Sequence, residues 1–567
     1  MSSSADSAPQ GSVRPGKDTT ERTIVKAAPN ALSYRRLELG PGEPHLERRE
    51  LLGRNTEGWD ADGERLARLL HITDFQLADL ASPSRVEFLQ RFTDVPQWRR
   101  MLPAYRPQEF MLTQAVEAIV RTVRREAEAY PAAVDLVVTT GDNTDSAQEN
   151  ELDLYLALMN GGGINPGKGN GSLADTVTCS GDAAYWNPGL SSRDEWKEQR
   201  GYPDYAGAVD AAAQKFTGVG LGAPWLTCFG NHDCLIQGRA EAPAGYDAFL
   251  TGDRKPVSRP VDREPGADAL DEYCGDPFWV SSGPSIPIES RTDRRIVSKQ
   301  EYIERHFEPS GTPLGHGFTP ENRENGSAYY TYDGVPGVRV ISLDTTNPAG
   351  HVDGCVNEVQ YRWLEARLQE VHSSHSAEDG SEVHPGNEDR LVVLCSHHGL
   401  STMNNATPQA DGQRLYLADA VEKLLHRYPN VMLWLSGHTH VNRVTARPRT
   451  DGGGFWEVSS SSVAEWPVQL RSVELIVVDG TGVRIRNTMI DSDVPISPTG
   501  GTDLAELASL HREAAANDPN SVGGLEAHGL STDRNVDLLV PLSPTVIRNV
   551  LKGMRETPAA GNLSTPT

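Results

Sequence analysis

The sequence lacks the features that mark membrane and secreted proteins. No run of 18 apolar residues occurs among its 567 residues, so we predict no transmembrane helix and no membrane partner. The N-terminal segment has no apolar stretch of the kind that secretion signals carry. The six cysteines include no CxxC pair, which favours reduced thiols over a disulfide framework. These absences predict a cytoplasmic location.

The chain also lacks an excess of basic residues. It has 53 Lys and Arg against 78 Asp and Glu, a formal net charge of -25. A nucleic acid would be repelled by such a surface, so we expect no bulk nucleic-acid binding. A small phosphorylated molecule is still compatible with this charge, because bound metal ions can supply a local positive field.

Glycine and proline are abundant, with 53 and 38 residues, which predicts many loops. We expect a disordered leader over residues 1–45, a catalytic domain over 46–497 and a polar C-terminal extension over 498–567. Long irregular insertions are expected at about 150–215 and 235–325. Because such insertions are usually functional loops or lids, we expect them to form the rim of a site and to set substrate choice.

The apolar patterns between these segments indicate an α/β protein. Residues 108–129 have apolar side chains at spacings of three and four, typical of one helical face. Residues 134–138 then form a short apolar run that reads as a strand. Further strands are predicted around residues 338–343 and 431–435. Strand, helix and strand in alternation are typical of a sheet covered by helices.

Five apolar runs end in side chains that are able to bind metal ions. Carboxylate, amide and imidazole groups at the ends of strands suit a divalent or trivalent transition metal. Taken singly, each ending is weak, since a Gly-Asp pair or a Gly-Asn-His run is most often a turn. Together and in order, they predict one shared metal site. The endings are His71-Ile72-Thr73-Asp74-Phe75-Gln76, Gly141-Asp142-Asn143-Thr144-Asp145, Gly230-Asn231-His232-Asp233, Ser396-His397-His398-Gly399 and Gly437-His438-Thr439-His440.

These endings resemble the motifs of the calcineurin-like metallophosphoesterase superfamily. Four of the five blocks match in order, and the resemblance covers roughly residues 64 to 495. The long insertions are similar to those of an actinobacterial branch of that superfamily. The resemblance implies a four-layer fold in which two central mixed β-sheets are flanked by helices. It also implies two metal ions at the strand ends.

The resemblance implies a role for each candidate ligand. Asp142 would bridge both metals, and the other candidates would each bind one of them. The first metal would take Asp74, Gln76 and His440, and the second would take Asn231, His397 and His438. His398 is the alternative to His397, because the sequence does not decide which of the pair points inward.

The first block departs from the superfamily at Gln76, where histidine is usual. An amide oxygen binds zinc-like ions more weakly than imidazole does, so manganese or iron is favoured, with zinc or magnesium possible. Three alternatives stay open: Gln76 binds weakly, Asp145 replaces it, or the first site fills only when substrate arrives.

The implied chemistry is hydrolysis of a phosphate mono- or diester of a small molecule. A hydroxide bridging two metals ~3.5–4 Å apart would attack phosphorus. His232 would protonate the leaving oxygen as general acid, and Asp233 would orient His232 or hold its charge. The alternatives are a nucleotide pyrophosphatase that uses the same site and a weakened scaffold that acts as a binding module. The sequence does not predict the oligomeric state.

Overall fold

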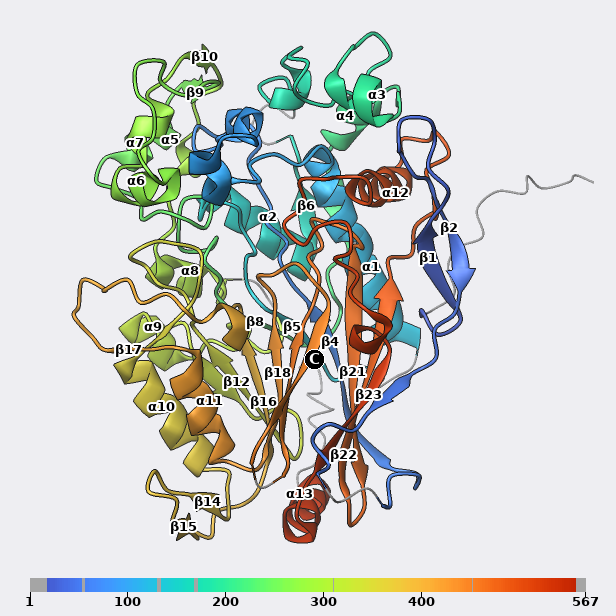
Figure 1. Cartoon of the computed structure of the whole chain (residues 1–567), viewed down its shortest axis with the longest axis vertical. Helices are drawn as coiled ribbons and strands as arrows, with labels where there is room; N and C mark the ends of the chain where they lie inside the picture. The colour runs from blue at the N-terminus through green and yellow to red at the C-terminus, as the bar shows by residue number, and fades with distance from the viewer. Residues whose placement is uncertain are drawn as a thin grey trace, which may run out of the picture.

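Two β-sheets pack face to face in the centre of the molecule, and helices cover their outer faces (Figure 1). The computed structural model describes residues 18–53, 57–129, 134–167, 172–308, 311–450 and 452–556. Both sheets mix parallel and antiparallel strands. The predicted α/β architecture of two central mixed sheets is therefore confirmed.

The first sheet has seven strands, with a parallel part that leads to the candidate site. Strands β4, β5 and β8 are parallel, and the chain returns antiparallel through β21 and β22. Its strand order is β3 (Leu46–Arg48), β23 (Val536–Pro541), β22 (Gly482–Asp491), β21 (Gln469–Val478), β4 (Glu64–Ile72), β5 (Leu136–Thr139) and β8 (Trp225–Thr227).

The second sheet has six strands, of which the four central ones are parallel. An antiparallel strand closes each edge. Its strand order is β11 (Tyr330–Tyr332), β12 (Val338–Leu343), β16 (Leu391–Ser396), β18 (Val431–Ser436), β20 (Gly454–Ser459) and β19 (Arg443–Pro448).

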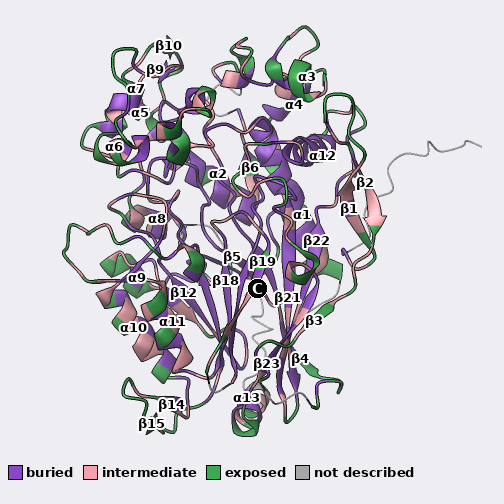
Figure 2. Ribbon diagram, viewed as in Figure 1, coloured by how far each residue is buried: buried purple, intermediate pink, exposed green. Residues whose placement is uncertain are grey.

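The central strands are apolar throughout because both of their faces are buried. Along β16, Val393 points into the core between the sheets, whereas Val392 and Leu394 point toward the outer helices. Successive side chains of a strand alternate between its faces, so one apolar run supplies both cores. Figure 2 shows the buried colour running through both sheets and exposed residues on the outer helical surfaces.

The helices form the outer two layers. Helix α1 (Leu112–Ala129) buries one face in the core of the first sheet, together with α2 (Glu149–Asn160). Helices α10 (Glu358–Gln369) and α11 (Ala418–His426) cover the second sheet. Within the described parts of the chain, no helix combines the length and apolar character needed to cross a bilayer.

The predicted leader is wrong over residues 18–45. Strands β1 (Arg22–Lys26) and β2 (Leu37–Pro41) form a hairpin there. Ile24 and Leu37 are buried against Trp466 and the end of helix α12 (Leu504–Ala515). These few apolar contacts fix a segment whose composition alone predicts disorder. Residues 1–17 of the leader lie outside the described residues.

The predicted C-terminal boundary at residue 497 is also wrong. Strand β23 pairs with β22 over six residue pairs and with β3 near the start of the chain. Helix α12 packs beside α1, and helix α13 (Pro544–Glu556) follows β23. The segment is polar on average but carries a buried strand, so the residues after 497 complete the first sheet.

The two predicted insertions carry regular elements and apolar clusters of their own. Residues 149–160, placed partly in the first insertion, form the core helix α2 instead. Short elements follow in both insertions. Most of them lie above the strand ends in Figure 1, but the last helix lies lower, beside the second sheet. They are β6 (Gly162–Ile164), α3 (Glu195–Arg200), α4 (Ala208–Ala212) and β7 (Phe216–Gly218) in the first, and α5 (Tyr246–Leu250), β9 (Arg254–Pro256), α6 (Ala269–Gly275), α7 (Phe278–Ser281), β10 (Ser285–Pro287), α8 (Lys299–Arg305) and α9 (Pro320–Asn325) in the second.

Aromatic residues hold the two insertions to the rest of the molecule. Trp186 and Tyr202 of the first insertion pack with Leu510 of α12. Trp279 of the second insertion packs against Trp98, with ring centroids 5.6 Å apart and ring planes tilted by 33°. The insertions are therefore packed lobes at the end of the molecule where the strand-end motifs lie.

The buried position of β23 gives a stability prediction. We expect Leu538→Ala to lower the free energy of unfolding by about 2–5 kcal/mol, because truncating a fully buried leucine leaves a cavity. Leu530→Ala is the control in the same C-terminal segment, since that side chain is 71% exposed. Urea unfolding followed by tryptophan fluorescence measures both. Equal, small effects for the two variants would show that β23 adds nothing to the core.

Candidate metal centre

Five candidate ligands have a backbone conformation that side-chain-bearing residues rarely adopt. Asp74, Gln76, Asp142, His438 and His440 all have φ between +43° and +66°. Each lies just after a strand of one of the two sheets, where the chain turns sharply. Non-glycine residues with positive φ cost conformational energy and cluster at functional sites. The strained turns aim all five motif side chains at the common end of the two sheets.

Glycines allow the loops of this site to touch. Gly141 has φ +88°, and a Cβ there would lie 2.9 Å from the nitrogen of Gly230. A Cβ on Gly230 would in turn lie 2.3 Å from the nitrogen of Asp142. Side chains at either position would push the second and third motifs apart. The glycines of these motifs are therefore required by close backbone approach.

Asp74, Asp142 and His397 meet in a buried cluster. The Nε2 atom of His397 lies 3.2 Å from Oδ2 of Asp142 and 4.0 Å from Oδ1 of Asp74. Donor atoms of the three residues all lie within 4.8 Å of one another. Two carboxylates and an imidazole this close are a suitable donor set for a transition metal.

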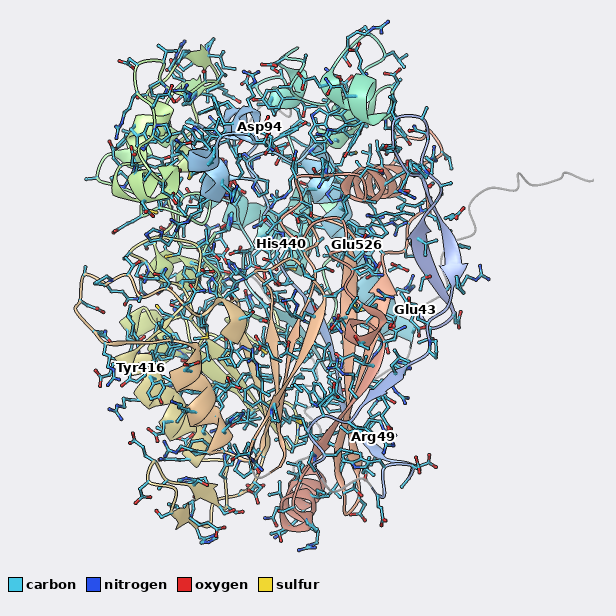
Figure 3. All side chains as sticks on the ribbon, in the orientation of Figure 1. Glu43, Arg49, Asp94, Tyr416, His440 and Glu526 are labelled. Carbon is cyan, nitrogen blue, oxygen red and sulfur yellow. The ribbon has the colours of Figure 1, made fainter. Side chains whose placement is uncertain are left out.

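Two more histidines join the cluster from the loop after β18. His440 places Nε2 3.3 Å from Oδ1 of Asp74, and its Nδ1 lies 3.1 Å from Oε2 of Glu465. His438 places Nδ1 3.2 Å from Nε2 of His397. A turn after Gly437 thus brings both histidines into one site. Figure 3 labels His440 near the upper ends of the central strands.

Asn231 offers a free oxygen. Its side chain donates from Nδ2 to the carbonyl oxygen of Gly238 at 3.0 Å. Its Oδ1 is buried and has no hydrogen-bond partner among the described residues. A buried polar atom without a partner is costly, so an unpaired amide oxygen here fits a metal ligand.

The hydrogen bonds of His397 and His398 distinguish the two residues. His397 donates from Nδ1 to the carbonyl oxygen of Thr140 at 2.8 Å, which leaves Nε2 free to face the carboxylates. The Nε2 of His398 is 2.9 Å from the carbonyl oxygen of Val352, and its Nδ1 is 2.9 Å from the hydroxyl of Thr345. Both ring nitrogens of His398 are engaged, so His397 is the better candidate ligand.

Gln76 lies in the site but is turned away from a ligand role. Its Oε1 accepts a hydrogen bond from Arg106 at 2.6 Å, and its Nε2 faces Oδ2 of Asp142 at 3.4 Å. The end of the amide that faces the cluster is therefore the donor, which cannot coordinate a metal. As placed, Gln76 does not supply the oxygen that the sequence predicts.

Asp145 does not replace Gln76 either. Its Oδ2 pairs with Arg85 at 3.1 Å and accepts from the hydroxyl of Ser146 at 3.2 Å. Arg85 also pairs with Glu109 at 2.6 Å. Asp145 is thus held in a buried ion-pair network beside the cluster.

His232 lies beside the cluster as the sequence predicts, but Asp233 does not orient it. The Nδ1 of His232 is 2.7 Å from the backbone oxygen of Asp145, and its Nε2 is 3.9 Å from Oδ2 of Asp142. The carboxylate of Asp233 accepts hydrogen bonds from the backbone nitrogens of Gly230, Asn143 and Thr144. Asp233 therefore holds the two loops together, and the Asp145 carbonyl takes the position beside His232.

The electrostatics of the cluster favour bound cations. Burial would raise the pKa of Asp142, but the neighbouring His397 and His232 hold that pKa far below its usual value. Burial would lower the pKa of His397, but Asp142 and Asp74 outweigh burial and raise it to about 9. In the same way, Glu465 and Asp74 raise the pKa of His440 to about 10. The site thus stabilises positive charge against a strong cost of burial.

The site contains residues that no motif indicated. Glu465 contacts His440, and Arg106 connects Glu465, at 2.8 Å, to Gln76. Both come from loops without a recognisable pattern. A carboxylate behind a ligand histidine is a common supporting contact, but its position along the chain is not predictable.

The residues present fit metal ions. The cluster combines carboxylate oxygens, an unpaired amide oxygen and imidazole rings. In His397, the ring nitrogen that faces away from the cluster is held by a backbone oxygen. That combination is typical of sites for transition metals.

Comparison with known proteins gives the family. The model of the calcineurin-like phosphoesterase family matches residues 67–442. A search of curated proteins finds no match. Similar solved structures include a dimetal phosphatase from Danio rerio, with 12% identity, a TM-score of 0.31 and coverage of 76% of this chain and 100% of that one. PhoD has 11% identity, a TM-score of 0.27 and coverage of 81% and 73%. The family match covers more than half of the chain, which therefore belongs to the calcineurin-like phosphoesterases, a family of metal-dependent phosphoric ester hydrolases.

Proposed function

We propose that this protein hydrolyses a phosphate mono- or diester of a small molecule at a site for two metal ions. The observation that carries the proposal is the convergence of Asp74, Asp142, His397 and His440 at one buried point, with His232 beside it. This arrangement supplies negative ligands for metals and one imidazole outside the ligand set.

The proposed ligands divide between two positions around Asp142. Asp74 and His440 would hold the first metal, and Asn231, His397 and His438 the second. Gln76 is not among the proposed ligands, because its oxygen accepts a hydrogen bond from Arg106. When bound, the metals would stabilise charge on the phosphoryl oxygens and lower the pKa of a bound water. Oxygen-rich coordination of the first position favours manganese or iron.

His232 would donate a proton to the leaving oxygen. The Asp145 carbonyl fixes the ring by accepting from Nδ1, so Nε2 faces the cluster. A general acid must reach the oxygen that leaves, and only Nε2 is placed to do so. Gln76 would position Asp142 through its amide nitrogen.

Elemental analysis together with an activity assay tests the proposal. We expect the purified protein to contain two equivalents of a transition metal and to hydrolyse p-nitrophenyl phosphate or its bis-ester. A chelator should abolish turnover, and added manganese should restore it. No turnover with any metal, combined with no bound metal, would refute the proposal.

Glu465 gives a separate prediction about metal affinity. We expect Glu465→Gln to weaken binding of one metal by about 10- to 100-fold, because the carboxylate behind His440 fixes that ligand. Equilibrium dialysis with manganese measures the change. Glu526→Gln is the control, since that side chain is 88% exposed. Unchanged affinity for both metals in Glu465→Gln would show that Glu465 does not support metal binding.

A further inference from the structure

Arg239 lies near His232, the proposed general acid, and has no carboxylate partner among the described residues. It lies in the second insertion and lines the same pocket as His232, Arg85 and Arg106. Among the described residues, no carboxylate oxygen lies within 4.0 Å of its guanidinium. Its terminal nitrogens donate only to the backbone oxygens of Gln237 at 3.0 Å and Pro103 at 3.3 Å. Its Nε is buried and unpartnered among the described residues.

The other two arginines of the pocket are neutralised. Arg85 contacts Glu87, Glu109 and Asp145, and Arg106 pairs with Glu465. Burial would lower the pKa of Arg85, but its acidic neighbours raise it well above its usual value. A buried charge that is unpaired is expensive, and this chain has acidic residues in excess. Arg239 therefore differs from Arg85 and Arg106 in that no carboxylate of the described residues offsets its positive charge.

The backbone around Arg239 is fixed against His232. A Cβ on Gly238 would lie 2.2 Å from Cδ2 of His232, so the segment touches the imidazole ring. The carbonyl oxygen of Arg239 accepts from the nitrogen of His351 at 2.8 Å and from the thiol of Cys274 at 3.2 Å. These contacts fix the backbone of Arg239 beside His232, and the side chains of both residues line the pocket in which the proposed leaving group would lie.

From these contacts we infer that the substrate carries a second anionic group, a carboxylate or a phosphate, on its leaving group, and that Arg239 binds it. The inference rests on the proposed phosphoesterase function. Arg239 has an unused Nε and partly used terminal nitrogens, which can donate to the oxygens of a carboxylate or a phosphate. Gln237 lines the same pocket, and its amide nitrogen can donate a further hydrogen bond to the same group.

Matched aryl phosphates test the inference. The substrates are 4-carbamoylphenyl phosphate, 4-carboxyphenyl phosphate and 1,4-phenylene bisphosphate, which carry no second anion, a carboxylate and a phosphate. We expect wild-type protein to prefer one of the two esters whose leaving group carries a second anionic group, by about 10- to 100-fold in kcat/KM and mainly through KM. The ester that is preferred shows whether Arg239 binds a carboxylate or a phosphate.

Three variants assign that preference to Arg239. Arg239→Gln should abolish the preference while changing turnover of the carbamoyl ester far less. Arg239→Lys should keep part of it, because the charge remains. Arg263→Gln is the control in the same insertion, since Arg263 pairs with Glu272 and is 48% exposed; it should leave the preference intact. No preference in the wild type, or an equal preference in Arg239→Gln, would overturn the inference.

A binding measurement separates this inference from the proposed function. Calorimetry with 4-carboxybenzylphosphonate, 4-phosphonobenzylphosphonate and benzylphosphonate, which lacks a second anionic group, needs no turnover. If the wild type hydrolyses none of the esters but binds a phosphonate with a second anionic group more tightly than benzylphosphonate, and Arg239→Gln does not, the proposed function fails and the anion site stands. Equal binding of all three phosphonates to both proteins rejects the anion site.

Discussion

Asp142→Asn should lower kcat/KM by at least about 10³-fold, since removing even one preorganised electrostatic group costs about 10²–10³ in rate. Asp142 faces His397 through Oδ2, and its Oδ1 accepts from the nitrogen of His232 at 2.9 Å. An asparagine keeps the size but loses the charge that both proposed metal positions share. Bound metal should fall together with activity. Steady-state kinetics and elemental analysis of the same sample measure the two losses.

Asp233→Asn is the matched control for that substitution. Asp233 is equally buried, but its oxygens accept from backbone nitrogens of the loops. We expect Asp233→Asn to lower the melting temperature while a folded sample keeps its metal. If Asp142→Asn retained two metals and near-normal activity, Asp142 would not be the shared ligand.

The second large effect is expected for His232→Ala. Loss of a general acid typically costs about 10²–10⁴ in rate. Metal content should remain, because His232 is outside the proposed ligand set and its ring is fixed by the Asp145 carbonyl. The defect should be largest for esters of poorly acidic alcohols and smallest for p-nitrophenyl esters, whose leaving group departs without a proton.

Kinetics with a series of aryl and alkyl phosphates measure that dependence. His384→Ala is the control, because His384 is 65% exposed. A uniform defect for all leaving groups, accompanied by loss of metal, would make His232 a structural or ligand residue instead of an acid.

Strand-end motifs predicted most of the candidate site because each motif is local. Asp74, Asp142 and His440 follow buried strands directly, and the parallel strands of each sheet bring their ends to one edge. The role of Gln76 was not predictable in the same way. Its orientation depends on Arg106, which reaches it from a loop of no recognisable type.

The fold was predictable to a similar degree. The long apolar runs predict the central strands, whereas the composition near both ends of the sequence does not predict the strands found there. Strand β3 has only three residues and no buried face that composition would reveal. Aromatic residues at irregular spacing, such as Trp186 and Trp279, also gave no sign that the insertions form packed clusters.

Pairing of β3 with β23 has a consequence for the order of synthesis. Leu46 leaves the ribosome long before its partner Val536 is made. All candidate metal ligands, up to His440, are therefore exposed to the cell before the sheet beneath them is complete. Contacts so distant along the chain slow folding. We expect newly made chains to depend on chaperones or early metal uptake until β23 emerges.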